Sequence, residues 1–420
     1  MEHVYVVILA AGQGKRFWPF TTNKSLVSFF GKPLIVHNLE RFAGAGFHRA
    51  IIVINPADVQ FYMDLALPNM EIRTVIQQEA VGMGDALLRV REHVGNSPML
   101  VVNAEDVVAP ALYGELAKNV SKNQSFLVGK KIDRYVDLGY LETNGDRVTG
   151  IVEKPGEGNE PSNLVNLVFH YVNKPAEFFE ILERQTSERD DVYERALDEL
   201  LKKSPFYYLS YEDIWLPLKY PWDLLDISAH LLAQSKDHRG KNVVIAPSAI
   251  LDGPIYIEDN VRIFDHTKIV GPVYIGANTI IGNTSMVRES HIGEGCVIGF
   301  NSDVTRSYIG DNCWCHSNYV GDSVLEGNIS MGSGTVLANL RLDEGEITSV
   351  VGQKKIHTGR TKLGAMIGSH TRIGVNTSIM PGVKIGADSF ISAGITVPSD
   401  VPEESFVTAE TKLTIVKNTK

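Results

Sequence analysis

An aliphatic residue recurs at every sixth position through most of the second half of the chain. The members fall into three stretches: Ile245, Leu251, Ile257, Ile263, Ile269, Ile275, Ile281 and Val287, then Ile292, Ile298 and Val304, then Ile367, Ile373, Ile379, Ile385, Ile391 and Val397. Neither the period of an α-helix nor the alternation of a strand produces this spacing. Three such hexads make one triangular coil with the aliphatic side chains inside. The repeat therefore predicts a left-handed parallel β-helix from about Val243 to Val407.

Glycine follows many of these aliphatic residues, as in Ile275-Gly276 and Ile385-Gly386. Glycine or asparagine suits the corners of the coils, where the backbone turns tightly. The regular spacing is lost between Tyr308 and Leu363. Because flat-sided rods pack side by side into closed cyclic assemblies, the β-helix also predicts a homotrimer.

The first half of the chain alternates apolar runs with amphipathic stretches. Val4–Ala10, Ala50–Asn55 and Met99–Asn103 read as buried strands, and Leu34–Ala45 reads as a helix. This alternation predicts a Rossmann-like α/β domain with a mostly parallel sheet, whose ligands bind at the carboxyl ends of the strands. The chain is expected to divide into an α/β domain at 1–222, a linker helix at 223–241, the β-helix at 242–408 and a C-terminal tail at 409–420.

Charge and composition argue against some classes of binding partner. A net charge of −10 over 420 residues argues against nucleic acid as the main partner. No apolar run approaches the roughly 18 residues of a membrane span, and the amino terminus has no basic leader. The three cysteines, Cys296, Cys313 and Cys315, are too few for a disulfide framework and lack the pairing of a zinc site. We expect a cytoplasmic protein with reduced thiols and no membrane attachment.

The first predicted strand ends in Leu9-Ala10-Ala11-Gly12-Gln13-Gly14-Lys15-Arg16. Small residues after a buried strand let backbone N–H groups approach a phosphate, and Lys15 and Arg16 add positive charge. A dinucleotide-binding fold needs a third glycine at the start of the helix, and this segment has none. On spacing alone, a phosphate site and an ordinary strand-to-loop turn remain equally open.

Together with the residues that follow it, this turn resembles the signature of the sugar-1-phosphate nucleotidylyltransferases. The matching segments are Leu9-Ala10-Ala11-Gly12-x-Gly14-x-Arg16-x-x-Pro19, Lys24-x-Leu26-Val27 and Gly31-Lys32-Pro33. The resemblance covers about residues 1–225. With the β-helix included, the whole chain is similar to the bifunctional nucleotidylyltransferase–acetyltransferases that make UDP-N-acetylglucosamine. The segment Leu337–Glu344 resembles the archaeal-type members in particular.

The resemblance implies a nucleotidyl transfer in which a sugar phosphate attacks the α-phosphorus of UTP or dTTP. Arg16 would stabilise the leaving pyrophosphate and the transition state, and Lys24 the α-phosphate. Asp106 would hold Mg²⁺, a cation that prefers carboxylates and substrate oxygens. Gln77, with the backbone near Gly82, would read the base. The residues implied to bind nucleotide and sugar are Ala11, Gly12, Gly14, Gln77, Gly82, Gly139, Glu153, Lys154 and Asn166.

One position departs from the family pattern. The family has a second metal-binding aspartate in an Asp-x-Gly segment, where this chain has Pro217 and Lys219. Proline cannot bind magnesium. Three accounts stay open: Asp223 or Glu105 supplies the second ligand, Lys219 replaces part of the cation's charge, or this domain is slow or inactive.

A second motif lies where the hexads are lost. Cys315–Asp322 resembles the family's Asn-His-x-Ser-Tyr-Ile-Gly-Asp segment, whose histidine is the base of the acetyltransferase, and Asn339 follows His316 by 23 residues, as in the family. An amine that attacks the thioester of acetyl-CoA must lose a proton, and a histidine near neutrality is a natural acceptor. Tyr319 and Asn339 would hold a hexosamine-1-phosphate and the developing oxyanion. Ala393 matches the coil along which acetyl-CoA lies.

The lysine that the family has in the following loop has no counterpart in Leu342–Thr348. Arg341, Lys354 or Lys355 could serve instead, so the preference for the acetyl acceptor stays open. Two other readings of the whole chain also remain. The β-helix could be a structural or regulatory module beneath a monofunctional nucleotidylyltransferase, or the first domain could be a degenerate sugar-nucleotide-binding protein.

Overall fold

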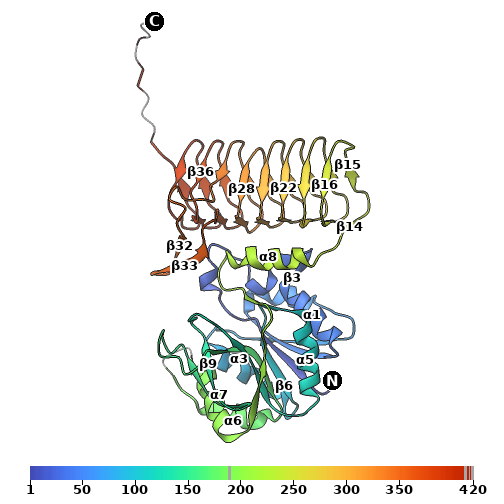
Figure 1. Cartoon of the computed structure of the whole chain (residues 1–420), viewed down its shortest axis with the longest axis vertical. Coiled ribbons are helices and arrows are strands. Elements are labelled where there is room, and N and C mark those ends of the chain that lie inside the picture. Colours follow the sequence, from blue (N-terminus) through green and yellow to red (C-terminus); the bar gives the residue numbers. More distant parts are fainter. Residues whose placement is uncertain (188–190, 411–413, 416, 418–420) are drawn as a thin grey trace. The chain divides into compact units, whose positions relative to one another are not determined.

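The computed structural model describes residues 1–187, 191–410, 414, 415 and 417, and the chain forms two compact units (Figure 1). The first comprises Met1–Gln13 and Pro33–Pro217, and the second Gly14–Lys32 and Leu218–Lys420. Most of the predicted tail at 409–420 lies outside the described residues. The predicted domain bounds stay a prediction. The segment Gly14–Lys32 groups with the β-helix although it lies near the start of the chain.

The first unit is built on a nine-stranded sheet. Its strand order is β5 (Glu71–Ile76), β4 (Arg49–Ile54), β1 (Tyr5–Leu9), β6 (Met99–Asn103), β11 (Leu164–Val172), β8 (Phe126–Lys131), β12 (Phe206–Ser210), β10 (Arg147–Glu153) and β9 (Gly139–Asn144). The four strands from β5 to β6 are parallel, as the sequence predicts. β11 is antiparallel to β6 and β8, and β10 is antiparallel to β9 and β12. The sheet is therefore mixed rather than mostly parallel. The antiparallel pair of β9 and β10 is joined directly by a tight turn at Gly145.

Helices cover both faces of this sheet. Successive residues of β1, such as Val6, Val7 and Ile8, are at most 1 % exposed, so neither face is open to solvent. The face that carries Val7 and Val101 forms one apolar core with residues of α3, α6 and α7. The helices of this unit are α1 (Leu34–Gly44), α2 (Val59–Met63), α3 (Met83–Arg89), α4 (Arg91–Val94), α5 (Pro110–Val120), α6 (Pro175–Arg184) and α7 (Val192–Lys203), with the 3-10 turn η3 (Pro56–Asp58).

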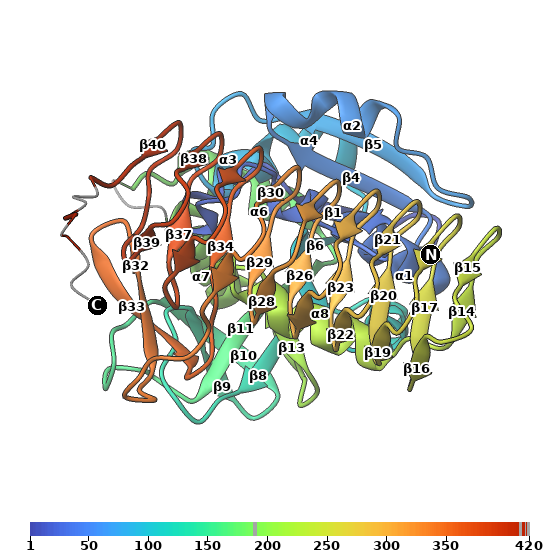
Figure 2. The ribbon, with the colours of Figure 1, turned by 90° about the horizontal axis from the view of Figure 1, so that it is seen from above.

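The second unit contains three long sheets of very short strands, and every pairing within them is parallel (Figure 2). The first face consists of β14 (His238–Arg239), β17 (Ile255–Ile257), β20 (Val273–Ile275), β23 (His291–Ile292), β26 (Tyr308–Ile309), β29 (Val324–Leu325), β34 (Met366–Ile367) and β37 (Lys384–Ile385). The second face consists of β15 (Val244–Ile245), β18 (Arg262–Ile263), β21 (Ile280–Ile281), β24 (Val297–Ile298), β27 (Trp314–Cys315), β30 (Ser330–Met331), β35 (Arg372–Ile373), β38 (Phe390–Ile391) and β40 (Phe406–Val407).

The third face consists of β16 (Ile250–Asp252), β19 (Lys268–Val270), β22 (Met286–Arg288), β25 (Asp303–Thr305), β28 (Tyr319–Gly321), β31 (Val336–Leu337), β36 (Ser378–Ile379) and β39 (Thr396–Val397). The chain visits the three faces in turn, so the predicted parallel β-helix is confirmed. The repeat residues form a single buried core that runs through all the coils. Buried hydroxyls in this core donate to carbonyls of the next coil, as Thr279 does to Gly293 at 2.8 Å.

The coils continue through most of the stretch between Tyr308 and Leu363, where the regular spacing is lost. Coils continue through β31, and their core positions are Val304, Ile309, Cys315, Val320, Leu325, Met331 and Leu337. Several steps in this series span five residues instead of six, and two core positions hold sulfur-containing residues. A search for an aliphatic at every sixth position therefore loses the register, although the stacking itself is unbroken.

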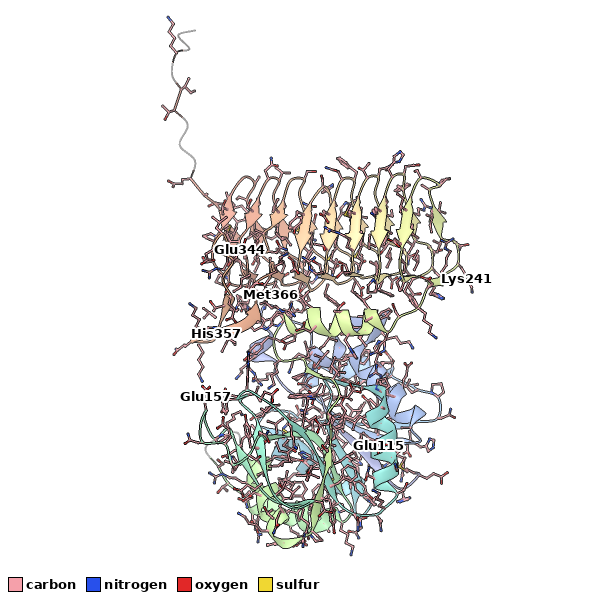
Figure 3. All side chains as sticks on the ribbon, in the orientation of Figure 1. Glu115, Glu157, Lys241, Glu344, His357 and Met366 are labelled. Atoms are coloured by element: carbon pink, nitrogen blue, oxygen red, sulfur yellow. The ribbon has the colours of Figure 1, made fainter. Side chains whose placement is uncertain are left out.

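The chain leaves the coils only between β31 and β34. This excursion contains a hairpin of β32 (Ile347–Val351) and β33 (Lys354–Arg360), which pair in antiparallel fashion. Glu344 lies on the excursion before the hairpin, His357 lies on β33, and the coils resume at Met366 (Figure 3). The three cysteines lie in the core of the coils and are free thiols, as predicted.

Glycine and asparagine occupy the corners for two different reasons. A Cβ atom on Gly299 would lie 1.9 Å from the carbonyl oxygen of His316 in the next coil, so this corner excludes any side chain. Asn260 and Asn278 instead adopt positive φ angles of 62° and 59°, which asparagine tolerates better than most residues. The corner prediction is confirmed, with steric exclusion as the cause at Gly299.

The segment Gly14–Lys32 of the second unit packs on the first face of the β-helix. Phe30 lies against Tyr274, with ring centroids 4.8 Å apart, and its backbone N–H donates to His291 Nε2 at 3.2 Å. The Tyr308 hydroxyl donates to the carbonyl of Ser28 at 2.8 Å. The short elements here are η1 (Lys15–Phe17), η2 (Lys24–Leu26), β2 (Ser28–Phe29) and β3 (Lys32–Pro33), and this unit also contains α8 (Asp223–Ala233).

No helix among the described residues is both long and apolar enough to cross a membrane.

Candidate functional site

The loop after β1 contains the small residues of the predicted phosphate turn. Ala11 is buried, whereas Gly12 is exposed, and a Cβ atom on Gly12 would meet nothing within 4 Å. Gly14 adopts a left-handed conformation with φ 62° and precedes η1, in which Arg16 is exposed. The open space around Gly12 leaves its backbone accessible to an incoming anion.

Lys24 lies on η2 and is half-buried rather than fully solvated. Its Nζ donates to the carbonyl of Leu218 at 3.1 Å. Both residues belong to the second unit. The contact holds the ammonium group against the backbone just before α8, so this lysine is not an ordinary mobile surface residue.

Gln77 and Gly82 lie together at the carboxyl end of β5. The Gln77 side chain is 4 % exposed, and its Nε2 donates to the Gly82 carbonyl at 3.0 Å and to Asp85 at 2.8 Å. Gly82 caps α3 with φ 103°, a backbone conformation that a side chain would strain. Because Nε2 is used within the chain, the carbonyl oxygen Oε1 is the part of this amide that a ligand can address.

Asp106 begins β7 (Asp106–Val108) and is 4 % exposed. β7 pairs with β13 (Trp215–Pro217), and the direct partner of Asp106 in this register is Pro217. Pro217, which the sequence analysis matched to the family's second aspartate, is therefore adjacent to Asp106. Among the described residues, no three or more His, Cys, Asp or Glu side chains gather as metal ligands.

The Asp223 carboxylate is engaged by the backbone at the start of α8. Its Oδ2 accepts from the N–H groups of Lys219 and Tyr220, both at 2.7 Å. Burial raises the pKa of Asp223 to about 6, although these two backbone bonds act in the opposite direction. These contacts indicate that the carboxylate stabilises the backbone turn before α8 in the second unit.

The residues predicted to bind the sugar lie on β9, β10 and β11. Gly139 and Glu153 are direct partners across the β9–β10 ladder, and a Cβ atom on Gly139 would lie 3.0 Å from Glu153 Oε2. Glu153 forms an ion pair with Lys154 at 2.9 Å. Asn166 is 8 % exposed and pairs with Gly129 of β8.

These positions of the first unit share one edge of the sheet. Leu9 at the end of β1 is level with Asn103 at the end of β6, and β5 ends level with β4. β11 runs antiparallel to β6, so its early residue Asn166 lies at this same carboxyl edge. Gln77, Asp106 and Asn166 therefore gather at the edge where α/β sheets bind ligands.

In the β-helix, His316 lies at the corner between the second and third faces and is exposed. The residues that stack behind it in successive coils are Gly332, Gly374 and Ser392, as their backbone hydrogen bonds show. Ala393 follows Ser392 and is also exposed. His316 and Ala393 thus share one corner of the prism, three coils apart, which is roughly 14 Å at the usual strand spacing.

Tyr319 and Asn339 lie over Gly321 on the third face. A Cβ atom on Gly321 would be 2.6 Å from the Tyr319 hydroxyl and 2.7 Å from Asn339 Nδ2. Asn339 Nδ2 donates to Asp322, whose carboxylate also receives two hydrogen bonds from Arg306, at 2.7 and 2.8 Å. Asp322 ends the motif found in the sequence, but no role was predicted for it. Arg306 was not singled out, because only the stacking of coils brings it next to Asp322.

The three residues proposed in place of the missing loop lysine differ in their surroundings. Arg341 is exposed, and its Nε donates to Asp343 at 2.8 Å. Lys354 and Lys355 are exposed on β33 of the hairpin. The two lysines are thus the candidates whose charge is displayed to solvent on a projecting element.

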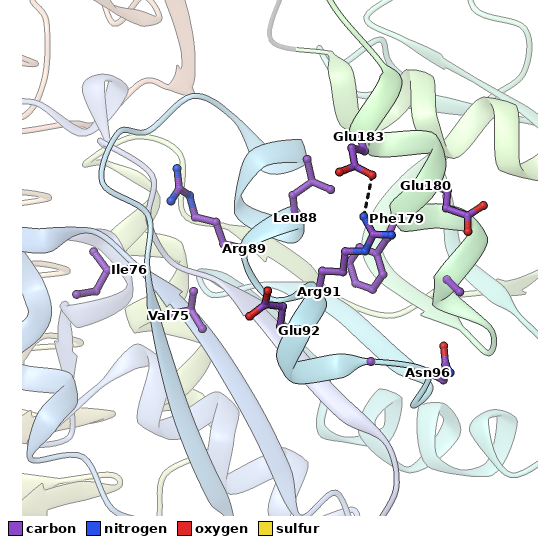
Figure 4. A pocket seen from close by; sticks show the side chains of 12 residues that line it. Val75, Ile76, Leu88, Arg89, Arg91, Glu92, Asn96, Phe179, Glu180 and Glu183 are labelled. Carbon is purple, nitrogen blue, oxygen red and sulfur yellow. Dashed lines mark hydrogen bonds and ion pairs between the residues drawn. The ribbon is translucent and has the colours of Figure 1, made fainter.

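A groove of about 920 Å³ lies elsewhere on the first unit, beside the edge strand β5 and between α3, α4 and α6 (Figure 4). An ion pair of 2.8 Å between Arg91 and Glu183 crosses it. The described residues that line this groove include Val75, Leu88 and Phe179 but no predicted site residue. Size alone therefore does not identify the site.

Comparisons with known proteins show which family the chain resembles. The nucleotidyl transferase family model matches residues 5–234. A bifunctional protein GlmU of Methanococcus vannielii is 30 % identical, over 98 % of this chain and 99 % of that protein. A bifunctional sugar-1-phosphate nucleotidylyltransferase/acetyltransferase of Sulfurisphaera tokodaii is 32 % identical, over 94 % of this chain and 97 % of that protein.

Among solved structures, a UDP-glucose pyrophosphorylase complexed with UDP-glucose is 21 % identical, with a TM-score of 0.50 over 56 % of this chain and 100 % of that chain. That likeness concerns the fold alone. The family match extends over more than half of the chain, and the two bifunctional relatives match it almost from end to end. This chain belongs to the family of bifunctional sugar-1-phosphate nucleotidylyltransferase/acetyltransferase enzymes.

Proposed function

We propose that the chain acetylates an amino-sugar-1-phosphate of the glucosamine-1-phosphate type with acetyl-CoA and transfers a uridylyl group from UTP to the sugar-1-phosphate. The nucleotidyl site lies at the carboxyl edge of the first unit's sheet, and the acetyl site on the β-helix. The substrates of nucleotidyl transfer are a nucleoside triphosphate and a sugar-1-phosphate, and the products are a nucleotide sugar and pyrophosphate.

The observation that carries the nucleotidyl half is the fixed amide of Gln77. Gly82 and Asp85 use its Nε2, which leaves a buried carbonyl oxygen as an acceptor for a base N–H. Uracil, thymine and guanine present a ring N–H at their Watson–Crick edge, whereas cytosine and adenine present an unprotonated ring nitrogen there. This favours UTP or dTTP over CTP and ATP, and the family resemblance favours them over GTP.

A divalent cation fits the arrangement if substrate oxygens complete its coordination. Asp106 offers one buried carboxylate, and its partner in the ladder is Pro217, which has no ligand to give. Mg²⁺ is commonly held by one or two carboxylates with phosphate oxygens and water, so one aspartate is compatible with it. When bound, Mg²⁺ neutralises charge that develops on the phosphates. Arg16 and Lys24 supply positive charge for the pyrophosphate and the α-phosphate.

The acetyl half rests on the corner that His316 and Ala393 share. An extended coenzyme can lie along such a corner, with its thioester near the imidazole and the rest of the molecule along the coils that lead to Ala393. His316 takes a proton from the attacking amine. Tyr319 and Asn339 hold the sugar phosphate and the oxyanion, and Asp322 keeps the Asn339 amide in place. A homotrimer would complete this exposed site with a neighbouring subunit.

A matrix of activities tests the proposal. Pyrophosphate release is measured with UTP, dTTP and GTP against N-acetylglucosamine-1-phosphate, glucose-1-phosphate and glucosamine-1-phosphate. Release of free thiol from acetyl-CoA is measured with glucosamine-1-phosphate. We expect turnover in both assays, with UTP or dTTP preferred to GTP. Pyrophosphate release without any free thiol would leave the β-helix as a structural module, and the acetyl half would be rejected.

A second candidate is a sugar-nucleotide-binding protein without nucleotidyl turnover. The proline opposite Asp106 favours it, since a carboxylate is missing where charge must be neutralised. Calorimetry with the nucleotide sugar separates the two functions. Tight binding with no pyrophosphate release from any substrate pair would support the binding protein.

A further inference from the structure

Three buried polar side chains form a chain beneath the predicted sugar site of the first unit. The Tyr193 hydroxyl of α7 lies 2.6 Å from His170 Nδ1, and His170 Nε2 lies 2.9 Å from Asn166 Oδ1. His170 is 0 % exposed and Tyr193 2 % exposed. The rings of Tyr193 and His170 are stacked, and Phe178 of α6 closes over Tyr193 at 5.6 Å.

The strand itself has to deviate to make this arrangement. β11 loses its regular register with β8 between Leu167 and His170, where two residues of β11 have no partner in the ladder. Asn166 and His170 are four residues apart and still point to the same side, toward the core formed with α6 and α7. A histidine in the middle of an apolar core needs partners for both ring nitrogens, and this chain supplies them.

The protons in the chain have one favoured arrangement. Burial lowers the pKa of His170 to about 3, although a hydrogen bond with the Leu167 backbone acts in the opposite direction. The ring is therefore neutral, with one nitrogen donating and the other accepting. Among the described residues, the His170 ring is the one hydrogen-bond partner of the Tyr193 hydroxyl. If that hydroxyl only accepted, its own hydrogen would be buried without an acceptor. It therefore donates to Nδ1, and the ring carries its proton on Nε2.

This proton order determines which end of the Asn166 amide faces the site. The protonated Nε2 requires an acceptor, which is the carbonyl oxygen Oδ1 of Asn166. The NH₂ group of the same amide is then turned away from His170. If the ring carried its proton on Nδ1 instead, Nε2 would accept and the amide would turn over.

We propose that His170 and Tyr193 are positioning residues for the sugar-1-phosphate, because they fix the Asn166 amide with its NH₂ group toward the sugar. The inference rests on the proposed nucleotidyl function and deepens it. Asn166 presents two donors, so the group of the sugar that faces it is an oxygen acceptor, either a hydroxyl or an amide carbonyl. A protonated amine at that position would place its N–H donors against the NH₂ donors of Asn166, so a sugar that carries it binds poorly.

Tyr193→Phe is the most discriminating variant, since it removes one oxygen atom and keeps the ring in place. Without the hydroxyl, both tautomers of His170 become accessible, and the Asn166 amide populates both orientations. We expect the KM for N-acetylglucosamine-1-phosphate to rise about tenfold, with the KM for UTP unchanged within twofold. Tyr171→Phe is the matched control: Tyr171 lies on the same strand as Asn166, is 0 % exposed, and changes neither KM.

His170→Gln and His170→Leu extend the test at the ring itself. A glutamine can still donate to Asn166 Oδ1, so we expect it to retain part of the affinity for the sugar. A leucine cannot donate, and we expect the KM for the sugar to rise by more than tenfold. Equal increases in the KM for UTP and for the sugar in these variants would contradict a positioning role and indicate a general loss of structure.

A spectroscopic measurement tests the arrangement without any turnover. Long-range ¹⁵N–¹H correlation spectra of the full chain report which nitrogen of each imidazole is protonated, and the His170→Gln variant assigns the His170 signals. We expect Nε2 protonated and Nδ1 unprotonated in the native protein, with a mixture in Tyr193→Phe. A native ring protonated at Nδ1 overturns the inference. If this tautomer is found but no substrate pair turns over, the proposed function fails and the orientation of Asn166 stands.

Discussion

The two candidate sites differ in how much of each one the chain completes by itself. At the carboxyl edge of the first unit, Gln77 and Asn166 are buried, and both amides are already bonded to other side chains of that unit. On the β-helix, His316 is exposed at a corner. The amide of Asn339 donates a hydrogen bond to Asp322, but it lies over the third face and not at the corner that carries His316.

This contrast indicates which site depends on its own side chains for specificity and which depends on packing against a neighbouring subunit. Buried amides with fixed partners are preorganised, so they can discriminate between bases and between sugars without further ordering. An exposed imidazole on the edge of a rod lacks the walls that exclude water from a reacting thioester. The nucleotidyl site should therefore depend mainly on single side chains, and the acetyl site on what packs against the corner.

His316→Ala gives the largest expected effect. Loss of a general base typically costs 10² to 10⁴ in rate, so we expect acetyl transfer to fall about 10³-fold. Pyrophosphate release should stay within twofold, because the variant alters an exposed side chain of the β-helix. Both rates are measured on one preparation, by free thiol and by pyrophosphate.

The matched control is His266→Asn, which changes another exposed corner histidine of the β-helix, at φ 58°. Asparagine tolerates this conformation. Acetyl transfer should be unaffected in the control. Parallel loss of both activities in His316→Ala would remove the distinction between the two sites.

Asp106→Asn should have the next largest effect, on the opposite activity. If one carboxylate carries the contact with Mg²⁺, its neutralisation should lower pyrophosphate release about 10²-fold and raise the Mg²⁺ concentration needed for half-maximal rate. Acetyl transfer should not change. The measurement is a titration of nucleotidyl activity with Mg²⁺.

Glu105→Gln serves as the companion variant, since Glu105 is an open candidate for a second ligand next in sequence to Asp106. A loss as large as that of Asp106→Asn would make it a ligand. An unchanged Mg²⁺ titration would leave Asp106 as the carboxylate that the cation needs.

Gln77→Ala should have a smaller effect that depends on the base. Removal of a buried acceptor should lower kcat/KM for UTP about 30-fold and reduce the preference for UTP over CTP, because a base N–H then has no partner. Gln78→Ala, the exposed neighbour, is the control. A uniform loss for UTP and CTP would mean that Gln77 supports the loop rather than reads the base.

Spacing in the sequence predicted the β-helix because each coil repeats the same demand for an aliphatic side chain inside. From Tyr308 onward the six-residue spacing is lost, because some steps span five residues and Cys315 and Met331 take core positions. The coils nevertheless continue to stack. A parallel coil needs one buried side chain per face. It does not need a constant number of residues at each corner. The core positions can therefore be identified only from the structure, not from their spacing in the sequence.

The candidate site was predictable to the extent that its residues lie in sequence motifs. Gln77 and Gly82 are five residues apart, and the structure joins them by a hydrogen bond. His170 was invisible in the sequence, because a lone histidine in an apolar strand gives no sign of its partners. Tyr193 arrives from a different helix, and the irregular register of β11 that aims His170 at Asn166 follows from packing.

Asp223→Asn should have the smallest effect, and it decides between a structural and a metal-binding role for this residue. An aspartate has a pKa near 3.9 in an unfolded chain, whereas burial raises the pKa of folded Asp223 to about 6. The folded state therefore binds the proton more tightly. Its free energy of unfolding falls as the pH rises from about 4 to about 6, and the loss persists above pH 6.

Asparagine keeps an oxygen for the N–H groups of Lys219 and Tyr220 and removes the buried charge. Because the side chain is only half-buried, we expect the variant to gain about 1 kcal/mol of unfolding free energy at pH 8 and nothing at pH 4. Urea unfolding at both pH values measures this, with Asp252→Asn, an exposed residue of the β-helix, as control. The Mg²⁺ titration of nucleotidyl activity should be unchanged. A variant that is no more stable at pH 8 but needs far more Mg²⁺ would make Asp223 the missing second ligand, and the hypothesis that Asp106 is the one carboxylate in contact with Mg²⁺ would then be wrong.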